Sequence, residues 1–128
     1  MEAANSEKKI ILVVDDLHTI LESIRIILKN DYQVITAKSA IQAEECLKQI
    51  KPDLILLDIE MPVMDGFSFL QRLRADEKNA DIPVIFVTAH ASPDIINRAM
   101  EAGVDGYVIK PFIPDALKRR IRGVLEKK

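Results

Sequence analysis

Cysteine is almost absent from this 128-residue chain, which also lacks long apolar runs and an excess of one charge. Cys46 stands alone, so an internal disulfide and a metal site built on several cysteines are excluded. A single thiol agrees with a reducing cytoplasm. No apolar run approaches the roughly 18 residues of a membrane span, and the first residues, MEAANSEKK, lack the apolar segment of a signal peptide. We therefore expect a cytoplasmic protein without a membrane anchor.

The charge balance and composition are those of an ordinary globular domain. A net charge of -2 gives no overall attraction to nucleic acid or to an anionic membrane, so a partner must be recognised locally. Hydrophobic residues make up 48% and charged residues 30% of the chain. Neither a repeat nor a Pro/Gly/Ser-rich linker divides the sequence. We expect a disordered lead over residues 1–7 and one folded domain over residues 8–128.

Three apolar runs are continuous instead of alternating: residues 10–14 (IILVV), 54–57 (LILL) and 84–87 (VIFV). Continuous runs are typical of strands covered on both faces, as in parallel sheets. Residues 32–37 (YQVITA) alternate and residues 106–109 (GYVI) form a short run, so both are predicted to be edge strands. The sequence thus predicts five strands, three of them internal.

Helical patterns fill the intervals between these runs. Apolar residues recur at helical spacing in two segments: Leu17, Ile20, Leu21, Ile24, Ile27 and Leu28 in the first, and Leu117, Ile121, Val124 and Leu125 in the last. Helix starts are predicted at Ser39, with Gln42 completing a capping box, at Asp65 before Gly66, and at Ser92-Pro93; Gly103 is placed at a helix C-terminus.

Strand and helix alternate five times, which predicts an α/β fold: a doubly wound, five-stranded parallel sheet with right-handed crossovers and helices on both faces. With the first, third and fourth strands inside, the strand order 2-1-3-4-5 of flavodoxin-like proteins fits. The pattern alone also allows permutations of the internal strands.

Polar residues stand where these strands are expected to end. Asp15 and Asp16 follow the first strand, Asp58 follows the third, Thr88 follows the fourth and Lys110 follows the fifth. Taken singly, an aspartate here is an ordinary helix cap, a threonine an ordinary strand-end hydroxyl and a lysine an ordinary solvated loop residue. In a doubly wound sheet, however, the carboxyl ends of the strands share the edge at which ligands bind. Together these residues therefore predict a functional site.

The electrostatics of such a cluster point to a cation and to phosphoryl transfer. Two carboxylates about 5 Å apart repel by roughly 3 kcal/mol at an effective dielectric constant near 20, so three of them require protons, Lys110 or a metal ion. Oxygen ligands without a neighbouring His or Cys favour Mg²⁺ over zinc. A carboxylate beside a metal, facing a lysine and a hydroxyl, is suited to forming an aspartyl phosphate. We expect Asp58 to accept a phosphoryl group.

The segments VVDD, LLDIEMPVMDG and VTA and the pair Lys110-Pro111 together resemble the CheY-like receiver domain of two-component response regulators. The resemblance extends from residue 8 to about residue 125, and residues 8–128 would form the receiver domain. It implies a signalling domain and not a turnover enzyme. Asp58 would be the phosphoacceptor, and the donor would be a phosphohistidine of a histidine kinase or of a histidine phosphotransfer protein.

The same resemblance implies a role for each of the other site residues. Asp16 would bind Mg²⁺ directly, Asp15 would do so through water or as a second carboxylate, and Asp58 and the backbone carbonyl of Glu60 would complete the set. Lys110 would pair with the phosphoryl group, and the Thr88 hydroxyl would swing in to hydrogen-bond it.

Three positions are implied to control the switch and its lifetime. Tyr107 occupies the place of the family's aromatic switch residue and would turn inward when Thr88 moves; a half-buried aromatic of an edge strand is the alternative. Glu60 and His90, each two residues after a site residue, would flank an attacking water and tune dephosphorylation. Exposed rim residues without a role are the alternative for both.

Phosphorylation would switch the surface formed by the helix that begins at Ser92-Pro93, the strand over residues 106–109 and the last helix. This surface would bind a downstream effector or a second copy of the chain as a homodimer. Ile95 is expected to be free for this surface, because Ile96 and Ala99 are predicted to fill the inward face of its helix. The basic residues of the last helix are predicted to form a solvated face, so we expect no direct nucleic acid binding by this chain and no membrane contact.

Two rival functions remain at this stage. A haloacid-dehalogenase-like phosphatase also uses an aspartate after an apolar strand with Mg²⁺, but its motif opens the chain and carries a second Asp where Glu60 stands here. A non-phosphorylated pseudo-receiver would be a binding module that keeps the fold and lacks the phosphoacceptor chemistry.

Overall fold

The computed structural model describes residues 8–90 and 92–127. The predicted lead over residues 1–7 lies outside the described residues. Over the described residues, strands and helices alternate in the order β1 (Ile10–Val14), α2 (His18–Leu28), β2 (Gln33–Ala37), α3 (Ala40–Leu47), β3 (Leu54–Leu57), α4 (Gly66–Ala75), β4 (Val84–Thr88), α5 (Pro93–Glu101), β5 (Gly106–Ile109) and α6 (Pro114–Glu126). In this part of the chain no helix has both the length and the apolar character needed to cross a membrane.

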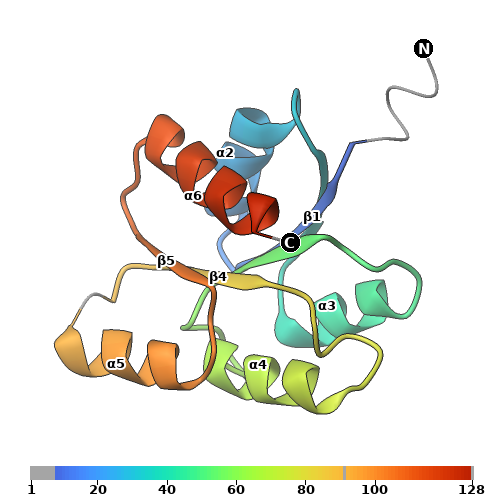
Figure 1. Ribbon diagram of the computed structural model, residues 1–128, viewed down its shortest axis with the longest axis vertical. Coiled ribbons are helices and arrows are strands. Elements are labelled where there is room, and N and C mark those ends of the chain that lie inside the picture. The colour runs from blue at the N-terminus through green and yellow to red at the C-terminus, as the bar shows by residue number, and fades with distance from the viewer. Residues whose placement is uncertain (1–7, 91, 128) are drawn as a thin grey trace.

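The strands form one parallel sheet in the order β2-β1-β3-β4-β5. Helices α2 and α6 cover one face, and α3, α4 and α5 cover the other (Figure 1). The predicted doubly wound fold, strand order and edge strands are therefore confirmed. The open choice among the internal strands is settled because Leu12 pairs with Ile55 on one side of β1 and with Ile35 on the other.

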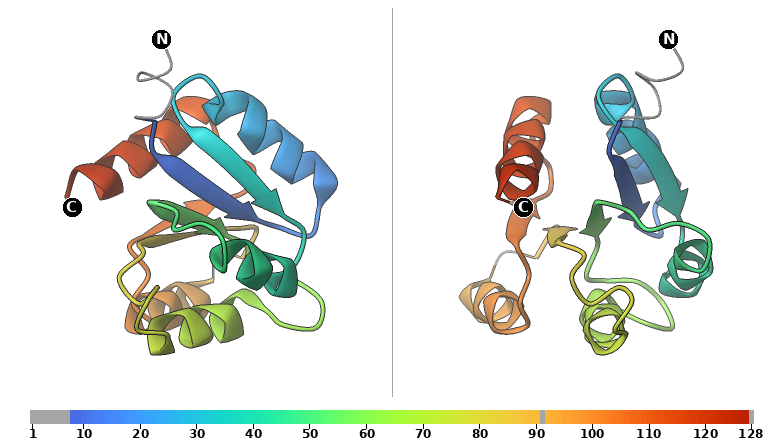
Figure 2. Two further views of the ribbon diagram at one scale, coloured as in Figure 1. Left: turned by 90° about the vertical axis from the view of Figure 1, so that its right-hand side faces the viewer. Right: turned by 45° about the vertical axis from the view of Figure 1, so that its right-hand side comes forward.

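The continuous apolar runs contribute side chains to two hydrophobic cores, one on each face of the sheet, because successive side chains of a strand point to opposite faces. Along β1, Leu12 and Val14 pack in the core beneath α3, α4 and α5, whereas Ile11 and Val13 pack in the core beneath α2 and α6. β3 and β4 divide their side chains in the same way. The two views of Figure 2 show the sheet between these helical layers. An interior strand that must bury both faces has no place for a polar residue before its end.

Helix starts agree closely with the caps predicted from the sequence. The side chains of Ser39, Asp65 and Ser92 each accept a hydrogen bond from a backbone N–H of the first turn, at 3.0, 2.8 and 3.3 Å. Gln42 completes the box in a modified form, because its Oε1 accepts from the backbone N–H of Lys38 and not from that of Ser39. Gly103 follows the C-cap Ala102 of α5 with a φ of 89°, a conformation that glycine adopts without strain.

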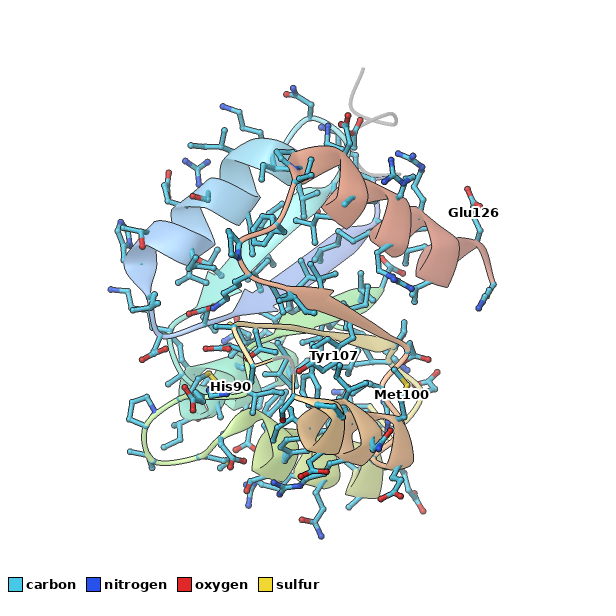
Figure 3. All side chains as sticks on the ribbon, turned by 90° about the vertical axis from the view of Figure 1, so that its left-hand side faces the viewer. His90, Met100, Tyr107 and Glu126 are labelled. Atoms are coloured by element: carbon cyan, nitrogen blue, oxygen red, sulfur yellow. The ribbon has the colours of Figure 1, made fainter. Side chains whose placement is uncertain are left out.

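Two apolar side chains lie on the opposite side from the one expected. Leu17 is the N-cap residue of α2 and is 52% exposed, since the helix begins one residue later and its buried stripe starts at Leu21. Ile95 is half-buried and packs against the core beneath α5, so it is not the fully exposed side chain that was expected. The exposed apolar residues of the α5–β5 region are instead Met100 and Ile109, and Figure 3 labels Met100 at the C-terminal part of α5.

Candidate functional site

The acidic residues meet because two central strands run side by side and end together. Val14 pairs with Leu57 in the sheet, and the next residues along each strand are Asp15 and Asp58. The backbone N–H of Asp58 donates to the carbonyl of Val14 at 3.0 Å, which fixes the position at which the chain leaves the sheet. Carboxylate oxygens of Asp15, Asp16 and Asp58 lie within 4.8 Å of one another. The structure thus brings the three predicted carboxylates into one cluster.

Burial differs among the three carboxylates and raises the pKa of Asp58. Asp15 is 2% and Asp58 6% exposed, whereas Asp16 is exposed to solvent. Burial raises the pKa of Asp58 from 3.8 to about 6, and the negative charge of Asp15 adds to this rise. The positive charge of Lys110 and a hydrogen bond from the backbone N–H of Ile59 oppose it. At neutral pH most molecules therefore carry an ionised Asp58 that is poorly stabilised by its surroundings.

Lys110 supplies the cation of the site, and it is closer to Asp15 than to Asp58. Its Nζ donates to Asp15 Oδ2 at 2.7 Å and lies 3.7 Å from Asp58 Oδ1. The other oxygen of Asp15 accepts from the backbone N–H of Leu17 at 2.9 Å. The Lys110–Pro111 peptide bond is cis, and the backbone N–H of Lys110 donates to the carbonyl of Thr88 at 2.8 Å. Asp15 therefore acts as the partner of Lys110 and is not the N-cap of α2.

Thr88 and Tyr107 are joined through the peptide groups of His90. Thr88 is 1% exposed, and its hydroxyl accepts a hydrogen bond from the backbone N–H of His90 at 3.3 Å. The hydroxyl of Tyr107 donates to the carbonyl oxygen of the same His90. Figure 3 shows Tyr107 on β5 and His90 on the adjoining loop. The ring of Tyr107 also packs edge-on against Phe86 at a centroid distance of 6.4 Å. The hydroxyl of Thr88 on β4 and the hydroxyl of Tyr107 on β5 thus both hydrogen-bond to the backbone of His90.

Glu60 and His90 contact each other directly. His90 Nε2 and Glu60 Oε2 are 2.5 Å apart, and the two side chains are 45% and 69% exposed. This contact joins the loop after β3 to the loop after β4, beside the carboxylate cluster. Both residues were predicted to lie near the site, but their pairing was not predicted, since 30 positions separate them and no periodicity relates them. The use of the Glu60 carbonyl as a metal ligand stays a prediction.

Gly66 allows the main chain at Asp58 to pack against the start of α4. A Cβ at this position would overlap the carbonyl oxygen of Asp58 and would lie 2.9 Å from Cα of Ile59. The backbone N–H of Gly66 donates to the carbonyl of Ile59 at 2.7 Å. Glycine is therefore required here by close backbone approach, in addition to the capping role of Asp65 that the sequence indicated.

The donor set suits a hard divalent cation. Its atoms are carboxylate oxygens, one aspartate is open to solvent, and the nearby ammonium of Lys110 neutralises part of the negative charge. Mg²⁺ prefers oxygen ligands and commonly retains several waters beside one or two carboxylates. The residues present therefore fit Mg²⁺.

Comparison with known proteins identifies relatives across almost the whole chain. The family model described as "Response regulator receiver domain" matches residues 11–122. The phosphate regulon transcriptional regulatory protein PhoB of Pseudomonas aeruginosa is 39% identical over 120 residues, which are 93% of this chain and 52% of the relative. The DNA-binding regulator RpaA of Synechocystis is 37% identical over 118 residues, or 91% of this chain and 49% of that protein. The chain thus spans about half the length of these curated relatives.

Solved structures agree with this comparison. The chemotaxis protein CheY4 of Vibrio cholerae superposes with a TM-score of 0.86 at 29% identity, covering 91% of this chain and 98% of that one. The receiver domain of a sensor histidine kinase from Pseudomonas aeruginosa gives a TM-score of 0.84 at 30% identity, covering 93% and 98%. That structure contains a magnesium ion coordinated in its active site cleft.

Proposed function

Because the chain belongs to the response regulator receiver domain family of two-component systems, we propose that it accepts a phosphoryl group on Asp58 and converts this event into a change of surface. The observation that carries the proposal is the convergence of Asp15, Asp16, Asp58 and Lys110 at the carboxyl ends of β1, β3 and β5. A receiver is a signalling domain, and the phosphoryl group on Asp58 is its signal and not a turnover product.

The transfer step needs an ionised Asp58. A carboxylate oxygen of Asp58 forms a bond to phosphorus while the bond from phosphorus to the imidazole nitrogen of a phosphohistidine breaks, and the electron pair of that bond stays on the nitrogen. With its pKa at about 6, Asp58 is mainly ionised at pH 7 and remains more basic than an ordinary aspartate. Burial by the surrounding apolar chain restricts access of water to the same atom.

Asp15, Asp16, Asp58 and the backbone carbonyl of Glu60 are proposed to hold Mg²⁺. When bound, the ion neutralises charge on the phosphoryl oxygens and on the carboxylates. Lys110 is positioned to contribute the second positive charge. Its ammonium contacts Asp15 in this structure and lies 3.7 Å from Asp58. It is therefore close enough to move toward a negatively charged phosphoryl group on Asp58.

The switch is proposed to work through the Thr88 hydroxyl. At present this hydroxyl accepts from the N–H of His90, and a phosphoryl group on Asp58 offers it a strong acceptor toward which its own proton can point. If the Thr88 hydroxyl gives up its hydrogen bond with the N–H of His90, the loop that contains His90 is held less firmly. The carbonyl of His90 is the acceptor for the Tyr107 hydroxyl, so Tyr107 is affected as well. Tyr107 would then turn toward the space near Thr88, and the surface of α5, β5 and α6 would change. Phosphorylation acts here only because it stabilises one arrangement more than the other.

The partners proposed are a histidine kinase or histidine phosphotransfer protein as donor, and a cytoplasmic effector protein or domain as receiver of the signal. A homodimer through α5, β5 and α6 is part of the proposal, since Met100 and Ile109 leave apolar surface exposed there. DNA binding named for RpaA belongs to a protein about twice the length of this chain.

A phosphorylation assay tests the proposal. Wild type and Asp58→Asn are incubated with a small phosphodonor and with a phosphohistidine donor, with Mg²⁺ or EDTA, and intact mass is measured. We expect one phosphoryl group on wild type with Mg²⁺ and none on Asp58→Asn. Failure of the wild type with both donors would favour the pseudo-receiver, and steady phosphate release from many small phosphoesters would favour the phosphatase.

A further inference from the structure

β2 is an edge strand, and one side of its backbone has no strand beside it. Among the described residues it pairs only with β1, and in the left view of Figure 2 no helix crosses in front of it. The N–H of Gln33 donates to the carbonyl of Lys9 at 2.9 Å, so the backbone groups of Gln33 point toward β1. Alternate residues of a strand bond to the same neighbour, so the N–H and C=O groups of Val34 and Thr36 point outward. These groups are open hydrogen-bonding sites.

The edge formed by β2 lacks the features that usually keep sheet edges apart. Edge strands are commonly protected by charged residues, by proline or by a bulge. β2 (QVITA) contains no charged residue and no proline, and its residues pair one to one with those of β1 in an unbroken register. Val34 and Ile35 are only half-buried, whereas Ile11 and Leu12, their partners on β1, are completely buried. A further strand at this edge would therefore satisfy backbone groups and cover apolar side chains.

The charges at the two ends of β2 favour a second copy of the chain in antiparallel orientation. Asp31 precedes the strand, Lys38 follows it, and both residues are exposed. Antiparallel strands bring Asp31 of one copy near Lys38 of the other, whereas parallel strands would bring like charges together. Asp31 is only loosely engaged within its own chain, since Nζ of Lys118 lies 3.8 Å from its carboxylate and the Asp31 side chain is 58% exposed. The edge is thus complementary to itself.

We propose that two copies of this chain pair through β2 in antiparallel orientation, about a two-fold axis at Ile35. In this register Val34 of each copy lies opposite Thr36 of the other, so the outward N–H and C=O groups bond to each other. The two Ile35 residues face each other as a non-hydrogen-bonded pair, with their Cα atoms about 4.5 Å apart. β2 and β5 are opposite edges of the sheet, so this contact is separate from the surface of α5, β5 and α6. It does not depend on the function proposed above.

Sedimentation equilibrium of the full chain at increasing concentration tests the pairing. Wild type is expected to pass from monomer to dimer. Asp31→Lys and Lys38→Glu each replace an attraction between copies by a repulsion, twice in a two-fold dimer, and each should raise the dissociation constant by about tenfold. The double variant exchanges the charges and should restore wild-type dimerisation, which an effect on folding alone would not do. Lys78→Glu, an exposed charge reversal in the loop after α4, should change nothing.

Cross-linking tests the register, in a Cys46→Ser background that removes the only native thiol. Ile35→Cys should form an intermolecular disulfide on oxidation with diamide, because the Cα separation on the axis is within disulfide reach. Thr36→Cys is the matched control: it is the more exposed position but lies opposite Val34, so it should not cross-link. A monomer at every concentration, a dimer that the single charge reversals leave unchanged, or equal cross-linking at both positions would each overturn the proposal. The charge variants decide even if Ile35→Cys does not fold.

Discussion

Lys110 forms an ion pair at 2.7 Å with the buried Asp15, although 95 positions separate them in the sequence. The same ammonium lies 3.7 Å from Asp58. One cation therefore offsets the charge of two buried carboxylates, and Asp16 adds a third negative charge at their open side. Without a metal ion, Lys110 is the group that makes this concentration of negative charge tolerable.

Replacing Lys110 should destabilise the metal-free protein and tighten metal binding. In Lys110→Met two buried carboxylates lose their partner, which costs about 3 kcal/mol of unfolding free energy. The affinity for Mg²⁺ should rise, since the ion no longer competes with an ammonium. Urea unfolding in EDTA and calorimetric titration with Mg²⁺ measure the two effects.

Lys51→Met is the control for this substitution. Lys51 pairs with Asp81 at 3.1 Å, but the two side chains are 50% and 69% exposed, so the loss should stay below about 1 kcal/mol. Equal destabilisation by the two substitutions would contradict the role assigned to Lys110.

Asp58→Asn should stabilise the metal-free protein, and the gain should depend on pH. Because folding raises the pKa of Asp58 from 3.8 to about 6, the folded state binds more protons than the unfolded state between these values. The stability of wild type therefore falls as pH rises through this window, by at most about 3 kcal/mol. Asparagine carries no charge and escapes this loss, so the variant and wild type should be similar near pH 4 and differ most at pH 7.

Urea unfolding in EDTA between pH 4 and pH 7 measures this difference. Saturating Mg²⁺ should reduce it, because the cation binds the ionised carboxylates of wild type. A difference that is constant across the pH range would contradict the assignment of the raised pKa to Asp58.

Glu60 and His90 should control the lifetime of the phosphorylated form as one unit. Since their side chains contact each other at 2.5 Å, Glu60→Ala and His90→Ala each remove the same contact. The double variant should then change the rate of dephosphorylation by less than the product of the single changes, and all three should still become phosphorylated. Decay of the phosphorylated mass with time measures the rates. Independent, multiplicative effects would show that the contact has no part in the rate.

Gly66 and Gly123 should respond to alanine in opposite directions. At Gly66 a Cβ would overlap the main chain at Asp58, so Gly66→Ala should destabilise the fold by about 2 kcal/mol or more and lower the yield of phosphorylation. At Gly123, within α6, a new Cβ would meet no atom of the described residues within 4 Å apart from its chain neighbours and the adjacent backbone of its own helix. Gly123→Ala should therefore stabilise by about 0.5–1 kcal/mol. Thermal and urea unfolding compare them. Stabilisation by both substitutions would remove the case for close packing at Gly66.

Several side-chain hydrogen bonds and ion pairs could not be predicted from the sequence. Arg74 on α4 donates to the carbonyls of Ala80, Ile82 and Gly103, which ties the ends of two loops to one helix. Nothing in the pattern around Arg74 distinguishes it from Arg72, whose guanidinium instead pairs with the half-buried Glu44 of α3. A guanidinium finds such partners only after the loops have taken their path.

The sequence by itself determined the sheet, the caps and the residues that reach the site. A strand buried on both faces must be continuously apolar, and parallel strands release their polar residues at one edge, so the cluster of Asp15 and Asp58 follows from local pattern. The tertiary structure alone decided that Lys110 pairs with Asp15, that Glu60 meets His90, and that Ile95 is packed while Leu17 is exposed. Periodicity records which face of an element is buried, whereas contacts between distant side chains depend on how loops and neighbouring elements place them.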